Sequence, residues 1–136
     1  MIDFMEKLPN VKIALDFHSP GPSVVMPYSW EPDESNPTLP RKAKMFYKFV
    51  FENAGLPEEY ITGTAIQTVE YTGYGIAIDW MMHERGIYSM APELGLGDRE
   101  DNEDVKFIED KEFLKDLVVA NSGWIEYIQG MLFEKV

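Results

Sequence analysis

The sequence predicts an α/β fold, built on part of a mixed, mostly parallel sheet with helices on both faces in three layers. Strand-like apolar runs alternate along the chain with amphipathic helical segments, which is typical of this class. The run from Val11 to Phe17 is apolar almost throughout, as in strands that a parallel sheet buries on both faces. The length of 136 residues fits one domain or a portion of a larger one.

The first half of the chain predicts two helices that flank two strands. Pro9 ends the first helical pattern, and Gly55 supplies a stop for the second. Pro27 cannot donate to an inner ladder, so it indicates an edge position or an early end of its strand. In order, the predicted elements are a helix over 2–8, strands over 11–17 and 23–28, a loop over 29–40 and a helix over 41–54.

The second half continues the alternation. β-Branched residues over 64–71 indicate a strand, and Gly73 and Gly75 then predict a mobile loop. The predicted elements that follow are a helix over 75–85 that Gly86 ends, a strand over 87–94, an acidic solvated loop over 98–112, and helical segments over 113–118 and 124–133 that cover the sheet.

Composition excludes several classes of function. Twenty-four acidic against twelve basic residues give a net charge of −12, which repels phosphate backbones, so no nucleic-acid partner is expected. Without cysteine, the chain has no disulfide framework, thiolate metal site or cysteine nucleophile. The longest uncharged run, 17–30, contains three prolines and is shorter than the ~20 apolar residues of a membrane helix, so no membrane insertion is expected.

Three polar residues, His18, Tyr71 and Glu93, fall at the predicted carboxyl ends of strands, where functional groups gather in α/β sheets. The imidazole of His18 would suit a metal ligand or a general base, and the carboxylate of Glu93, in an apolar segment, would suit a base with a raised pKa. Each residue also has a purely structural interpretation. His18 could be a hydrogen-bonded structural histidine, Glu93 an ordinary ion-paired carboxylate, and Tyr71 a packed aromatic. His83 is expected at a solvent-facing helix position.

The spacing of these residues resembles that of the zinc carboxypeptidases of the carboxypeptidase A type. The resemblance covers nearly the whole chain in the right order. It rests on the segment Val11-Lys12-Ile13-Ala14-Leu15-Asp16-Phe17-His18-Ser19, on Met26-Pro27-Tyr28, on Tyr71 followed by Asp79-Trp80, and on Glu93-Leu94.

The resemblance implies roles for five residues in zinc-assisted removal of a C-terminal residue from a peptide. His18 matches the family's third zinc ligand, and Ser19 matches the neighbour whose backbone lines the substrate subsite. Tyr71 matches the mobile tyrosine that closes over the C-terminal residue. Glu93 matches the glutamate that takes a proton from the attacking water and passes it to the departing amine. Ile78 matches a position in the side-chain pocket and implies apolar or aromatic C-terminal residues.

The chain departs from the family pattern at the substrate subsite and at the zinc site, and its acidic stretch over 98–112 is longer than the family's usual turn. Pro20 stands where many members have tyrosine, which puts the contact at that subsite in doubt. The His-x-x-Glu pair that gives the first two zinc ligands is absent, so the zinc site is incomplete in this chain. Residues 1–136 therefore resemble the C-terminal portion of a catalytic domain.

Two hypotheses follow from these departures. In the first, the chain is part of a working metallocarboxypeptidase, completed by an N-terminal half-domain and inactive alone. In the second, it is a catalytically inactive carboxypeptidase-like subunit with a structural role in an assembly. Both predict another protein segment or subunit on the open edge of the sheet.

Overall fold

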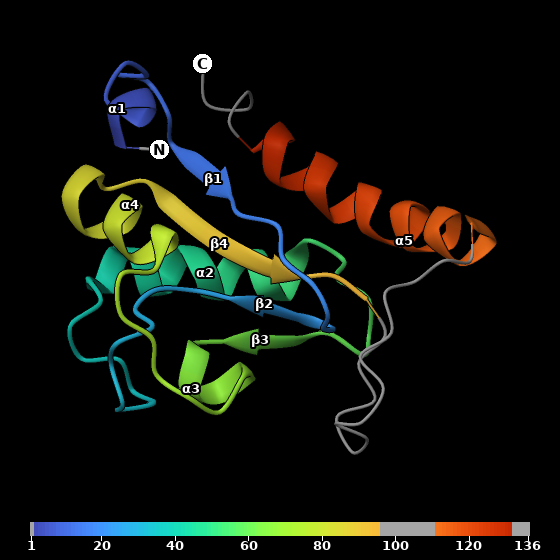
Figure 1. Ribbon diagram of the computed structural model, residues 1–136, viewed down its shortest axis with the longest axis horizontal. Helices are drawn as coiled ribbons and strands as arrows, with labels where there is room; N and C mark the ends of the chain where they lie inside the picture. The colour runs from blue at the N-terminus through green and yellow to red at the C-terminus, as the bar shows by residue number, and fades with distance from the viewer. Residues whose placement is uncertain (1, 96–110, 132–136) are drawn as a thin grey trace.

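The computed structural model describes residues 2–95 and 111–131 and has a mixed α/β architecture (Figure 1). Its sheet has four strands in the spatial order β1-β4-β2-β3. The predicted α/β class is therefore confirmed. The strands are β1 (Ile13–Leu15), β2 (Ser23–Val25), β3 (Ile61–Gly63) and β4 (Tyr88–Glu93).

The sheet is mixed because one of its pairings is antiparallel. β1 pairs with β4 in parallel and β2 pairs with β3 in parallel, whereas β2 runs antiparallel to β4. The carboxyl ends of β1 and β4 therefore lie at one end of the sheet, where Ser23 at the start of β2 is opposite Glu93. Chain segments that leave β2 and β3 start from the opposite end.

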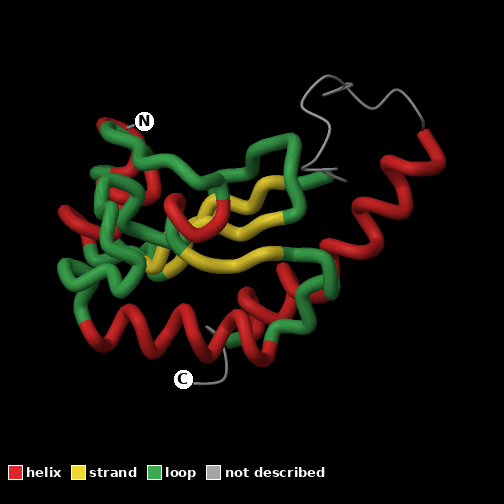
Figure 2. Tube along the Cα trace, turned by 90° about the horizontal axis from the view of Figure 1, so that it is seen from below, coloured by secondary structure: helices red, strands yellow, loops and turns green. Residues whose placement is uncertain are grey.

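Helices pack on both faces of the sheet, as the sequence predicts. Because side chains alternate along a strand, Val24 and Met90 lie in one core cluster, and Val25 and Ala91 lie in a second. In Figure 2, α2 lies along one side of the strands. The helices are α2 (Arg41–Asn53) and α5 (Lys111–Gly130) at the first cluster, α1 (Ile2–Met5) and α3 (Ala65–Thr68) at the second, and α4 (Ala77–Arg85), which contributes residues to both.

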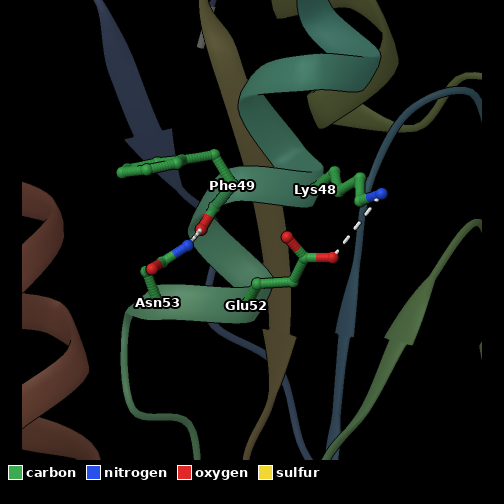
Figure 3. A network of polar contacts seen from close by, with 4 residues as sticks. All are labelled: Lys48, Phe49, Glu52 and Asn53. Atoms are coloured by element: carbon green, nitrogen blue, oxygen red, sulfur yellow. Dashed lines mark hydrogen bonds and ion pairs between the residues drawn. The ribbon is translucent and has the colours of Figure 1, made fainter.

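Helix α2 forms within a residue of its predicted bounds. Its buried face carries Ala43, Tyr47 and Val50. On its exposed surface, Lys48 pairs with Glu52 one turn later at 3.7 Å, as Figure 3 shows. The neighbouring Asn53 amide donates to the carbonyl oxygen of Phe49 at 2.8 Å, which satisfies a carbonyl near the end of the helix.

The predicted strand over 64–71 is wrong, because that segment starts a helix. Thr64 has extended backbone and forms a capping box with Gln67, whose side-chain oxygen accepts the Thr64 backbone N–H at 2.9 Å. This local bonding stabilises the short helix α3, and the strand of this region, β3, lies before it at 61–63.

Two further elements differ from expectation. β1 lies at an edge of the sheet with its side chains half-buried, rather than buried on both faces. α5 is one continuous helix through Gly123 rather than two segments, and its first turns extend away from the sheet in both Figure 1 and Figure 2. Most of the predicted acidic loop, 98–110, lies outside the described residues. In the part of the chain that is described, no helix is long and apolar enough to cross a membrane.

Candidate functional site

The structure places His18 and Glu93 side by side, at the carboxyl ends of β1 and β4. The two residues form a parallel β-bridge beyond the regular ladder. The backbone N–H of His18 donates to the carbonyl oxygen of Pro92 at 2.8 Å, and the N–H of Leu94 donates to the carbonyl oxygen of His18 at 2.8 Å. Paired residues on neighbouring strands are about 5 Å apart and share a face of the sheet. The two side chains can therefore act on the same small group.

Asp16 contacts His18 from the same strand segment. One carboxylate oxygen of Asp16, Oδ2, lies 3.3 Å from Nε2 of His18, and both side chains are partly exposed. Residues two apart on an extended strand have their side chains on the same face, so the spacing of Asp16 and His18 in the sequence predicts this contact. A carboxylate on one imidazole nitrogen orients the ring and leaves the other nitrogen available for a metal or a proton.

The surroundings of Glu93 favour its protonated form. Burial raises the pKa of the Glu93 carboxyl; His18 opposes this shift, and the Asp16 carboxylate adds to it. A carboxyl with a raised pKa is a better proton acceptor at neutral pH than an ordinary surface glutamate. The raised pKa agrees with the apolar sequence context of Glu93, and its role as a general base stays a prediction.

Gly21 is a part of the site that the sequence reasoning missed. A Cβ atom at position 21 would lie 2.3 Å from Cβ of Glu93 and 3.0 Å from its carbonyl oxygen. The backbone N–H of Gly21 also donates to the carbonyl oxygen of Leu94 at 3.3 Å. The turn after His18 thus folds back directly onto Glu93, and only glycine permits this approach. The Ser-Pro-Gly turn in the sequence is the signal that could have indicated it.

Ser19 lies next to the His18–Glu93 pair. It is exposed and joined to Pro20 by a cis peptide bond. Its predicted role, to present backbone to a substrate, stays a prediction.

Tyr71 and Ile78 lie elsewhere in the fold. Tyr71 follows α3 rather than a strand, and its side chain is 65% exposed. The nearby Gly73 N–H donates to the carbonyl oxygen of Ser29, beyond the carboxyl end of β2 and so away from the end where Glu93 lies. Ile78 on α4 is fully buried with Val25 in the second core cluster. Their predicted roles at a substrate are not tested by this arrangement.

His83 occupies an exposed position on α4, as the sequence predicts. Its ring lies edge-on to Tyr28 and Trp30, with centroid distances of 5.9 and 6.0 Å. It therefore packs against the segment that follows β2.

The described residues do not complete a zinc site. Within 2–95 and 111–131 there is no group of three or more histidine, aspartate or glutamate side chains that could hold a metal ion. A catalytic zinc takes three protein ligands, so His18 could supply one of them and other segments would have to supply the rest.

Comparisons with known proteins identify no relative from which a function could be transferred to this chain. No family model matches this sequence, and no curated protein matches it either. The function proposed for the chain therefore rests on the pairing of His18 with Glu93.

Proposed function

We propose that this chain is the C-terminal portion of a zinc carboxypeptidase-like catalytic domain. When an N-terminal half completes it, the domain would remove a C-terminal apolar residue from a peptide. The observation that carries the proposal is the β-bridge between His18 and Glu93, which brings a possible metal ligand beside a carboxyl of raised pKa. The resemblance of the motifs around both residues adds to it.

In this proposal Glu93 is the general base. Its carboxylate accepts a proton from the attacking water and returns it to the departing amine, so that one group serves both halves of the hydrolysis. Asp16 orients the His18 ring from 3.3 Å. The chemistry that zinc supplies when bound is polarisation of the scissile carbonyl and activation of water near neutral pH.

The remaining predicted residues would act on the C-terminal part of the substrate. Ser19, next to His18, would present backbone groups, and the exposed Tyr71 would close over the terminal residue by movement of its segment. Ile78 would form the apolar base of the side-chain pocket. Because its side chain is fully buried, that pocket would require a rearrangement of the second core cluster.

The edge strand β1 is where a completing half would bind. β1 pairs with β4 on one side, and in the described residues its other side faces no strand. Phe17, just after it, has a side chain 48% exposed. An unpaired strand edge with apolar side chains is suited to another strand.

The test is reconstitution with the N-terminal half. We expect the mixture to hydrolyse a blocked dipeptide with an apolar C-terminal residue, and Glu93→Gln to reduce the rate by at least about a hundredfold while zinc content is unchanged. Glu84→Gln, at an exposed glutamate on α4, is the matched control and should keep full activity. An active Glu93→Gln complex would remove Glu93 from its role.

The second hypothesis, an inactive carboxypeptidase-like subunit, predicts a different outcome of the same experiment. The two halves would then form a stable complex that neither hydrolyses the dipeptide nor binds zinc in stoichiometric amount. That result would contradict the proposed peptidase and favour a structural role for the chain.

A further inference from the structure

Asp79 is a buried carboxylate without an assigned role. It lies in the first turn of α4, and its side chain is 2% exposed. Both of its oxygens accept the backbone N–H of Ser29, at 2.9 and 3.0 Å, and the Ser29 hydroxyl donates to Oδ1 at 3.3 Å. Among the described residues it makes no ion pair. Burying a carboxylate lowers the stability of the fold unless its contacts compensate for the lost hydration. The contacts of Asp79 with Ser29 are therefore expected to have a structural purpose.

Ser29 also bonds to the segment between α3 and α4. Its carbonyl oxygen accepts the backbone N–H of Gly73 at 2.9 Å. Gly73 lies between α3 and α4, two residues after Tyr71. A chain of hydrogen bonds therefore runs from Asp79 through Ser29 to the segment that carries Tyr71.

The same face of α4 holds the neighbours of Ser29 as well. Tyr28 and Trp30 stack on each other with ring centroids 4.1 Å apart, and both meet the ring of His83 edge-on. His83 lies four residues after Asp79, so the two side chains share one face of the helix. Residues 28–30 are thus held at two points, and Ser29 is a fixed support for Gly73.

We propose that Asp79 is a positioning residue that, through Ser29, holds Gly73 in place and so fixes the point about which the segment that carries Tyr71 moves. The anchoring is a statement about this chain alone. Its consequence for a substrate rests on the function proposed above.

Amide hydrogen exchange tests the anchoring without any activity. In the full chain we expect Asp79→Ala to speed exchange of the Gly73 amide by about tenfold or more, since hydrogen bonds to a charged group are strong. Exchange of the Asp16 amide, which bonds to the Met90 carbonyl within the sheet, should change less than about twofold.

Two milder variants keep the test decisive if Asp79→Ala does not fold. Asp79→Asn retains one acceptor for the Ser29 amide, so Gly73 should exchange faster than in the wild type by a smaller factor, about threefold. Ser29→Ala removes the hydroxyl bond alone and should leave Gly73 exchange within about twofold of the wild type.

Unchanged Gly73 exchange in both Asp79 variants would overturn the proposal. Equal acceleration of exchange at Gly73 and Asp16 would also overturn it, because that would indicate a general loss of stability.

If the reconstituted enzyme is active, Asp79→Asn should raise KM at least threefold and leave kcat within twofold. A wild-type mixture with no activity would contradict the proposed function, while the exchange data would still decide the anchoring.

Discussion

The carboxyl groups of Asp79 and Glu93 are both in surroundings that disfavour their charged form. The groups that stabilise the charge differ between the two. Burial raises the pKa of Asp79 to about 6, although hydrogen bonds from Ser29 pull it down. Burial also raises the pKa of Glu93, where the neighbours are the titratable side chains of His18 and Asp16 rather than fixed backbone donors. Asp79 therefore has the setting of an anchor, and Glu93 has the setting of a group that exchanges protons.

The raised pKa of Asp79 predicts a pH-dependent contribution to stability. The unfolded carboxyl has a pKa near 3.8, so between about pH 6 and 4 the folded state binds a proton that the unfolded state does not. This contribution is therefore unfavourable at neutral pH and is relieved as the pH falls. Relative to Asp79→Asn, the wild type should gain about 2 kcal/mol of unfolding free energy between pH 7 and 4.5, measured by urea unfolding. Parallel profiles for the two proteins would show that Asp79 titrates normally.

Gly21 provides a second prediction at the level of one residue. Gly21→Ala would place a Cβ atom 2.3 Å from Cβ of Glu93, so we expect a loss of about 1–3 kcal/mol in unfolding free energy and a displaced Glu93. Gly123→Ala in α5 is the matched control, because no atom of the described residues lies within 4 Å of its added Cβ. That control should be stabilising by about 0.5–1 kcal/mol. A neutral Gly21→Ala variant would mean that the turn moves away at little cost.

The sequence predicts the His18–Glu93 contact but misses the Asp79–Ser29 contact, for a physical reason. His18 and Glu93 each follow an apolar run, and the rule that parallel strands end at the same edge brings them together. Asp79 bonds a backbone amide fifty residues away. Because any residue but proline offers such an amide, no side-chain pattern marks Ser29 as the partner.

At the scale of the secondary-structure elements, α5 is tied to the rest of the fold through Asn121. Its side chain is 3% exposed, and its Oδ1 accepts the Tyr60 hydroxyl at 2.9 Å and the Trp124 indole N–H at 2.8 Å. Asn121→Ala would leave both donors without this acceptor, and we expect a loss of about 1–3 kcal/mol in unfolding free energy. Faster amide exchange within α5 should accompany it.

The neighbouring Ser122 is the control for this prediction. Its side chain is exposed and, among the described residues, bonds within the helix to the Val119 carbonyl. Ser122→Ala should therefore change the unfolding free energy by less than about 0.5 kcal/mol. Equal effects at both positions would contradict the role of Asn121 as the link to Tyr60.

Elements with a strong period are predicted well, and elements set by short-range bonding are not. α2 has an apolar face over 13 residues and β4 a long apolar run, so pattern alone finds both. β3 and α3 are three and four residues long. The Thr64–Gln67 capping box separates them, and its effect outweighs the β-branched composition that indicated a strand.

At the scale of the whole molecule, the net charge and the edge strand β1 have opposite effects on association between copies of the chain. The net charge of −12 keeps copies of the chain apart. The side of β1 that faces no strand in the described residues offers backbone groups that attract another strand. Salt screens charge repulsion over about 10 Å at 0.1 M, but it leaves backbone pairing intact. Raised salt therefore favours association through β1.

This balance predicts salt-promoted self-association of the isolated chain, visible as a concentration-dependent sedimentation coefficient. Phe17→Lys should weaken it, because a lysine beside an edge strand opposes pairing with a second strand. Phe49→Lys is the matched control, since Phe17 and Phe49 are both 48% exposed and Phe49 lies on a helix, α2, rather than next to a strand in the sequence. If both variants weaken association equally, general apolar exposure drives it. If the wild type stays monomeric at every salt concentration, β1 does not recruit a strand, and the completing half must bind elsewhere on the molecule.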